Sequence, residues 1–230
     1  MDSVTNHPTG SKLAAYIAPF VVFMGFLALA SVVGHLGTGF WFEQPMYWIY
    51  PVQTIACAAV LWWYWRRYEM HRFAQVFFTL AIGVLVFVLW IAPQAFFGFD
   101  ARTEGFNPNT FADQPGLYWG TVLLRFLRLV IIVPLVEEIF WRGFLLRYFV
   151  NEKFETVPFG TFTWLSFAIV TGGFMLVHNM ADWPAAAVTG ALYNFVAYRT
   201  KSLTSCVVAH AVTNLLLGLW IMRTEQWGFW

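Results

Sequence analysis

Long apolar runs alternate with short polar segments along most of this chain. Seven runs predict helices, at residues 13–36, 46–64, 73–91, 117–149, 161–178, 184–198 and 203–222. A helix needs about 20 apolar residues to cross a hydrocarbon core of roughly 30 Å, and most of the runs are near this length. The pattern therefore predicts an all-α fold, a polytopic transmembrane helix bundle of about seven spans.

Two runs depart from a simple span. The fourth run contains Pro134 and is too long for one straight span, so we expect a kink there. The segment before it, residues 94–115, is polar and rich in turn-forming residues, which predicts a long loop outside the hydrocarbon.

The amino-acid composition of the chain is also typical of a membrane protein that is surrounded by lipids. Hydrophobic residues make up 60% of the 230 residues and charged residues only 11%, whereas soluble domains have about 25% charged residues. The net charge of +1 gives no basic surface for nucleic acid, so we expect no nucleic-acid partner. Cys57 and Cys206 lie in apolar runs without metal-ligand spacing, and we expect both to be buried free thiols.

The distribution of Lys and Arg predicts the orientation. With the N-terminus inside, eight lie on the cytoplasmic side and two on the other. The cytoplasmic eight are Lys12, Arg66, Arg67, Arg72, Arg147, Lys153, Arg199 and Lys201, and the other two are Arg102 and Arg223. Cytoplasmic loops are enriched in these residues, so we expect the N-terminus inside.

Three of the charged residues in the fourth run lie close together: Glu137, Glu138 and Arg142. A charge at membrane depth costs several kcal/mol, so such residues usually mark a functional site. Glu138 and Arg142 are four residues apart and can pair on one helix face, while Glu137 points to a neighbouring face. We therefore expect one neutralised carboxylate and one that is free to react.

Two further pairs share a helix face, Phe174 with His178 and His210 with Asn214. At about 1.5 Å per residue, Glu137 lies roughly 15 Å from the basic boundary of its helix and His210 roughly 13 Å from the boundary of its own. His178 would lie deeper, at roughly 25 Å. We expect it to reach the others because the returning run, 184–198, is short enough to keep the hairpin apex inside the protein.

These three motifs, Glu-Glu-x-x-x-Arg at 137–142, Phe-x-x-x-His at 174–178 and His-x-x-x-Asn at 210–214, carry a resemblance. In order and rough spacing the sequence resembles the CAAX prenyl protease and bacteriocin-processing (CPBP) intramembrane proteases, the type II CAAX group, over about residues 117–218. Trp141 stands where the family often has Phe. The resemblance divides the chain into N-terminal spans with the long loop, residues 1–116, and a catalytic membrane core, residues 117–222, with the active site in the bundle interior.

The resemblance implies a role for each motif residue. Glu137 would activate a water molecule as general base with help from His178, and His210 and Asn214 would stabilise the oxyanion. Glu138, Arg142 and Phe174 would be structural or supporting. A cavity open to the cytoplasm would admit the water. No cofactor is favoured; the alternative is a divalent metal such as zinc held by Glu137, His178 and His210.

The predicted function is an intramembrane endopeptidase acting on a membrane-associated or lipidated, possibly prenylated, protein or peptide. It would lie in the plasma (inner) membrane if the protein is prokaryotic. One alternative is a non-catalytic immunity factor or scaffold of the same fold, against which the complete motif set argues. Another is a proton-coupled transporter, since intramembrane carboxylates and histidines also mark proton paths. The absence of a duplicated half with broken helices argues against it.

Arg125 and Arg128 lie outside the motifs, in the outward half of the fourth run. We expect them to snorkel towards the outer interface or to pair with Asp113 or Glu104. The alternative is that they hold a carboxylate of the substrate.

Overall fold

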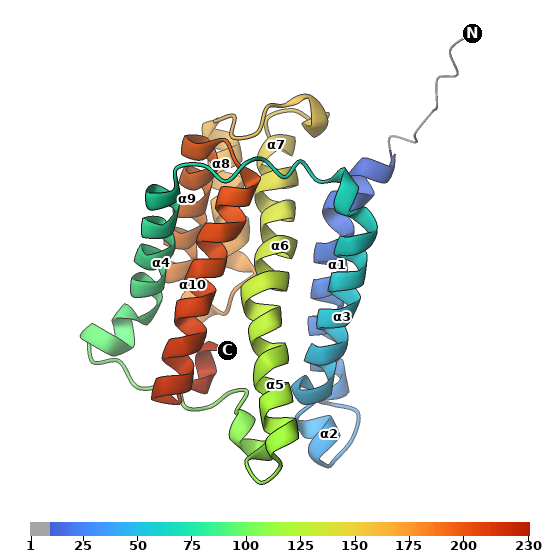
Figure 1. The fold of residues 1–230 in the computed structure, drawn as a ribbon, viewed down its shortest axis with the longest axis vertical. Coiled ribbons are helices and arrows are strands. Elements are labelled where there is room, and N and C mark those ends of the chain that lie inside the picture. Colours follow the sequence, from blue (N-terminus) through green and yellow to red (C-terminus); the bar gives the residue numbers. More distant parts are fainter. Residues whose placement is uncertain (1–9) are drawn as a thin grey trace.

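The structure, a computed structural model, describes residues 10–230, and these form a helical bundle without β-strands (Figure 1). The α-helices are α1 (Gly10–Val33), α2 (Phe40–Glu43), α3 (Met46–Tyr64), α4 (Val76–Phe96), α5 (Pro115–Leu127), α6 (Val133–Glu138), α7 (Leu146–Tyr148), α8 (Trp164–Leu176), α9 (Trp183–Thr200) and α10 (Leu203–Thr224). Two π-helical segments, η3 (Arg128–Ile132) and η4 (Ile139–Leu145), join α5, α6 and α7 into one helix. The all-α prediction is confirmed.

Among residues 10–230, four helical stretches are long and apolar enough to cross a membrane: Lys12–Val33, Val76–Phe96, Pro115–Tyr148 and Leu203–Thr224. Large apolar side chains cover the outside of the bundle; Trp62 is 82% exposed and Phe77 91%. Soluble proteins rarely expose apolar surface on this scale. The chain is therefore an integral membrane protein.

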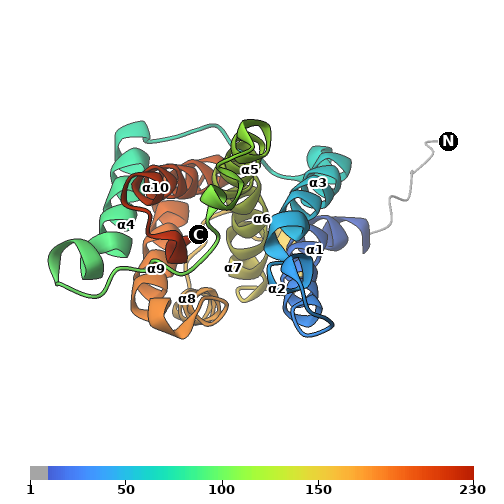
Figure 2. The same ribbon diagram turned by 90° about the horizontal axis from the view of Figure 1, so that it is seen from below.

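The long helix Pro115–Tyr148 runs through the middle of the bundle (Figure 1). Helices α1 and α3 lie on one side of it, and α4, α8, α9 and α10 on the other, as the view from below also shows (Figure 2). Gly83 lets α4 approach α10 closely, because a Cβ atom at this position would lie 2.7 Å from the Ala209 carbonyl oxygen. The core therefore has close helix–helix contact beside the central helix.

The central helix continues through Pro134, where the sequence predicts a kink. Proline has no backbone N–H to donate, and the turn before it widens into the π segment η3. A second π segment, η4, begins directly after Glu138. Such π segments occur mostly inside α-helices and are frequent at functional sites. These two lie on either side of the Glu137–Glu138 pair.

The α8–α9 hairpin does not reach the far end of the bundle. Helix α8 has 13 residues, a length of roughly 20 Å, against a hydrocarbon thickness of about 30 Å. It begins at Trp164, after the N-cap Thr163, and ends at Leu176, so His178 lies in the following turn and not within a helix as predicted. In Figure 1 the hairpin stops above the lower ends of α5 and α10. The apex is not enclosed by the protein as predicted, because Leu176 and Met180 beside it are 61% and 74% exposed.

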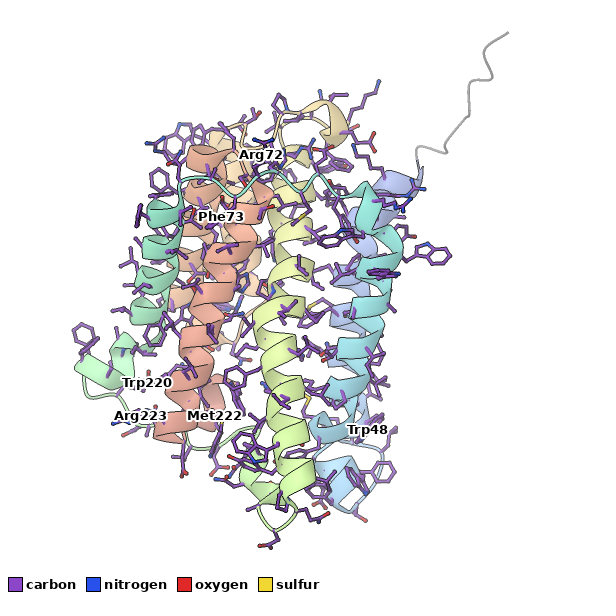
Figure 3. All side chains as sticks on the ribbon, in the orientation of Figure 1. Trp48, Arg72, Phe73, Trp220, Met222 and Arg223 are labelled. Carbon is purple, nitrogen blue, oxygen red and sulfur yellow. The ribbon has the colours of Figure 1, made fainter. Side chains whose placement is uncertain are left out.

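The connections fall at two ends of the bundle. One end, which we call the basic end, holds residues 65–75, 149–163 and 201–202; the opposite end holds residues 34–45, 97–114 and 225–230. Figure 3 shows Arg72 at the basic end and Arg223 at the opposite one. The loops that carry most of the Lys and Arg residues thus lie at one end of the bundle, as the predicted orientation requires.

An ion-pair network holds the basic end together. Glu69 accepts from Lys12 at 2.7 Å and from Arg147 at 3.0 Å, which links the α3–α4 connection to α1 and α7. Partial burial by itself raises the pKa of Glu69, but the hydrogen bond from Lys12 and the charge of Arg147 outweigh it, so the pKa lies below its ordinary value.

Candidate active site

One cavity of about 390 Å³ lies in the bundle and is lined by all four predicted catalytic residues, Glu137, His178, His210 and Asn214. Glu137 comes from α6, His178 from the turn after α8, and the other two from α10. The structure therefore brings together residues from three separate parts of the sequence. The volume of the cavity is within the range of about 300–1,000 Å³ that is common for ligand sites.

The cavity extends from Glu137 towards the opposite end of the bundle. Its outer lining includes Arg102, Asp182 and Gly228, and Arg102 pairs with Asp182 at 2.6 Å. Between Glu138 and the basic end the bundle is filled instead by buried side chains such as Tyr16 and Leu203. The predicted opening at the end that carries most Lys and Arg residues is therefore not found for this cavity.

Glu138 is fully buried and paired. Its Oε1 accepts from Arg142 Nη1 at 3.0 Å, as the sequence predicts, and also from His210 Nδ1 at 2.9 Å. Arg142 donates further to Asn194 Oδ1 at 3.1 Å and to the Gly190 carbonyl at 3.0 Å. The pair thus joins the central helix to α9 and α10, and Glu138 also orients His210.

Glu137 has the reverse environment. It is 9% exposed and lines the cavity. Its Oε2 is buried, with no hydrogen-bond partner among residues 10–230. Glu138 Oε2 is also buried without a partner among these residues, but Glu138 does not line the cavity. The two adjacent carboxylates therefore differ in that Oε1 of Glu138 is held by protein groups, whereas Glu137 has an oxygen free to accept from a molecule in the cavity.

The hydrogen bonds of the two histidines determine which ring nitrogen is left for the cavity. His178 Nδ1 lies 2.7 Å from the Phe174 carbonyl oxygen, and because a carbonyl only accepts, Nδ1 carries the proton. His210 Nδ1 donates in the same way to the Glu138 carboxylate. In each neutral ring Nε2 is then an acceptor, and it becomes a donor only when the ring is protonated.

Asn214 keeps one donor for the cavity. Its Nδ2 donates to the Leu129 carbonyl at 2.8 Å, and an amide nitrogen carries two hydrogens, so one N–H is left for the cavity.

Tyr193 supports the neighbouring His210, because the two rings lie 5.1 Å apart and the Tyr193 hydroxyl donates to Thr213 Oγ1 at 2.7 Å. Tyr193 lies in an apolar run without a motif, so nothing in the sequence points to it.

Residues 118–216 match the family described as type II CAAX prenyl endopeptidase Rce1-like. This Rce1-like region begins in α5, ends in α10 and contains all three motifs, which confirms the resemblance seen in the sequence. No curated protein and no solved structure matches the chain. The family is one of peptidases that act on proteins, and it supports that general activity here.

Two aromatic residues of the Rce1-like region support the motif residues by packing. Phe174 is buried, with its ring centroid 4.7 Å from that of His178 and 5.0 Å from the Arg142 guanidinium carbon. Trp141, where the family often has Phe, packs edge-on against Phe174 at 5.9 Å. The Trp141 side chain thus reaches the site through packing on Phe174.

The Rce1-like region also places Arg125 and Arg128 on the wall of the same cavity. They are 3% and 7% exposed, so they do not snorkel to an interface. Among the described residues neither forms an ion pair, with Asp113 and Glu104 or with any other carboxylate. The predictions that these arginines snorkel to the outer interface or pair with Asp113 or Glu104 are therefore both wrong.

A metal is a further possibility for this donor set. Within residues 10–230, no three carboxylate, imidazole or thiol side chains gather closely enough to hold a metal ion. Glu137, His178 and His210 line one cavity but do not converge on a single point as ligands must. We therefore assign no step of the chemistry to a metal.

Proposed function

We propose that this protein is an intramembrane endopeptidase that hydrolyses a peptide bond of a membrane-associated protein or peptide. The observation that carries the proposal is that the four motif residues, all of which belong to the Rce1-like region, line one cavity. Peptide hydrolysis needs a base for water and donors for the oxyanion, and this set of side chains contains both.

Glu137 is the proposed general base. Its unpartnered Oε2 accepts a proton from a water molecule while the oxygen of that water attacks the scissile carbonyl carbon. His178 Nε2 is a second acceptor that orients the water. After the tetrahedral intermediate forms, Glu137 returns the proton to the nitrogen of the leaving amine, and the C–N bond breaks.

Asn214 and His210 are the proposed oxyanion donors. The second N–H of Asn214 is free to donate, whereas His210 Nε2 donates only when its ring is protonated. The Glu138 carboxylate accepts from Nδ1 and so fixes the orientation of the ring. In this proposal Glu138 is therefore a positioning residue, which adds to the structural role predicted from the sequence. Each donor aimed at developing charge contributes about 2.7–4 kcal/mol to transition-state stabilisation.

For the membrane arrangement we keep an N-terminus inside and, in a prokaryote, the plasma (inner) membrane. Of the roughly seven spans that the sequence predicts, we propose that the α8–α9 hairpin enters the membrane from the basic end and returns to it without crossing, because α8 has only 13 residues. With this orientation the cavity opens towards the extracytoplasmic side, since its outer lining includes Arg102 and Gly228. We also keep the division into N-terminal spans, 1–116, and a catalytic core, 117–222. It is a functional division, because Gly143 of the core packs against Tyr16 of α1.

Cleavage of membrane-anchored peptides in liposomes tests the proposal. The wild type should cleave, Glu137→Gln and Asn214→Ala should lose most activity, and a chelator should leave it unchanged. Substrates with and without a prenyl group would show whether the lipid contributes. Equal cleavage by wild type and Glu137→Gln would reject the mechanism, and no cleavage of any peptide would favour a non-catalytic scaffold.

A further inference from the structure

Arg125 and Arg128 are two buried cations that form no ion pair with a carboxylate in the described part of the chain. Nε and Nη1 of Arg125 are buried without a hydrogen-bond partner among residues 10–230. Arg128 has one neutral partner, because its Nε donates to Gln53 Oε1 at 2.8 Å. A buried charge that is not in an ion pair is unfavourable, so two like charges of this kind on one cavity wall favour an anion from outside the chain.

Aromatic rings hold both guanidinium groups in place without neutralising them. The Tyr50 ring lies 4.4 Å from the guanidinium carbon of Arg125 and 4.1 Å from that of Arg128. Phe106 contacts Arg125 at 4.9 Å and Phe23 contacts Arg128 at 5.0 Å. Cation–π contacts leave the N–H groups in the guanidinium plane available, and these are the groups that bind a carboxylate in a bidentate way.

The π segment η3 turns the arginines towards the side of Glu137. In a regular α-helix Arg128 and Arg125 would lie roughly 180° and 120° around the axis from Glu137, nine and twelve residues away. One extra residue in the turn removes roughly 100° of this rotation, which leaves about 80° and 20°. This is why all three side chains line the same cavity.

We propose that Arg125 and Arg128 form a subsite that binds the C-terminal carboxylate of the peptide substrate. The inference rests on the proposed peptidase function. The arginines lie roughly 13 and 18 Å along the helix axis from Glu137. An extended chain covers about 3.3–3.6 Å per residue, so roughly four or five residues fit between the scissile bond and the carboxylate. The enzyme would therefore cleave at a fixed short distance from a free C-terminus.

The test uses two peptides that differ only in their C-terminus, a carboxylate in one and an amide in the other. For the wild type, kcat/KM should be roughly 10- to 100-fold lower for the amide, the range of one charge-assisted hydrogen bond. The loss should appear in KM. For the Arg125→Gln and Arg128→Gln variants, kcat/KM for the acid peptide should fall to the value for the amide peptide. The kcat/KM for the amide peptide should change little relative to the wild type.

Arg223→Gln is the matched control, because Arg223 is an exposed arginine at the same end of the bundle. It should keep the wild-type preference for the acid. If the wild type cleaves both peptides equally well, the subsite proposal fails while the peptidase function stands. If it cleaves neither, the peptidase function fails.

A lipid phosphate is the other source of a suitable anion, and mass spectrometry of phospholipid retained by the purified variants distinguishes it. Loss of bound phospholipid in Arg125→Gln, with equal slowing of both peptides, would overturn the carboxylate proposal. The wild-type comparison needs no variant, so the inference can be tested even if the substitutions prevent folding.

Discussion

Glu137 and Glu138 are adjacent in sequence, but they lie at the border of two differently built regions. Towards the basic end, Glu138 and Arg142 belong to a network that reaches Asn194 and His210. Within residues 10–230 this network still leaves Glu138 Oε2 without a partner. Towards the opposite end, Glu137 and Arg125 also have buried polar atoms without a partner in residues 10–230, and these two residues line the cavity. Buried polar groups are normally satisfied. The difference indicates that the first region stabilises the bundle, whereas the second keeps groups available for a ligand.

Glu137→Gln should give the largest effect on the cavity region. Loss of a general base reduces the rate by about 10²–10⁴-fold, and the isosteric amide should preserve folding. Cleavage rate and thermal unfolding measured on the same preparation check both parts. A large fall in thermal stability would contradict the division into a stabilising and a functional region.

Arg142→Met should give the largest effect on stability. It leaves the buried Glu138 without its arginine and with only the hydrogen bond from His210, and breaking a buried ion pair costs about 3–5 kcal/mol. Arg125→Met is the matched control on the same helix, and its unfolding free energy should stay the same or rise because it removes an unpaired charge. Denaturation in mild detergent measures both. Equal destabilisation by the two substitutions would show that the regions do not differ in this way.

The two regions should also differ in their access to reagents. A membrane-impermeant thiol reagent should modify Val177→Cys, which lines the cavity, when added from the side of the opposite end. It should not modify Ile139→Cys, which is buried in the packed region. Both native cysteines are buried, so background should be low. Labelling of Val177→Cys only from the basic end would reverse our assignment of the cavity mouth.

Glu69→Gln should give the smallest effect, because the Glu69 ion pairs lie near the surface of the basic end. The pKa of Glu69 is lowered in the folded state, so its contribution to stability is present above the unfolded-state pKa and is lost as pH falls through the folded-state value. We expect the variant to lose less than about 1 kcal/mol at neutral pH and to match the wild type in strong acid. Thermal unfolding across this pH range measures the difference.

The local features of this protein could be predicted from its sequence. The apolar runs give the helices, and the four-residue spacing gives the Glu138–Arg142 pair. The His210–Glu138 bond could not be predicted, because it joins residues 72 positions apart. The position of Arg125 and Arg128 on the cavity wall could not be predicted for a different reason. Sequence spacing assumes 3.6 residues per turn, and the π segment η3 changes that value between these arginines and Glu137.

The segment η3 also has an evolutionary consequence. Deletion of a single residue between Leu129 and Ile131 would let this stretch return to regular α-helical winding. Arg128 and Arg125 would then stand about eight and eleven residues from Glu137, at roughly 80° and 20° around the axis, which are the angles that the π segment gives now. A relative one residue shorter at this point would therefore keep both the hydrolytic groups and the two arginines on the cavity side. A one-codon difference in length here would leave the substrate specificity unchanged, and only loss of the arginines themselves would alter it.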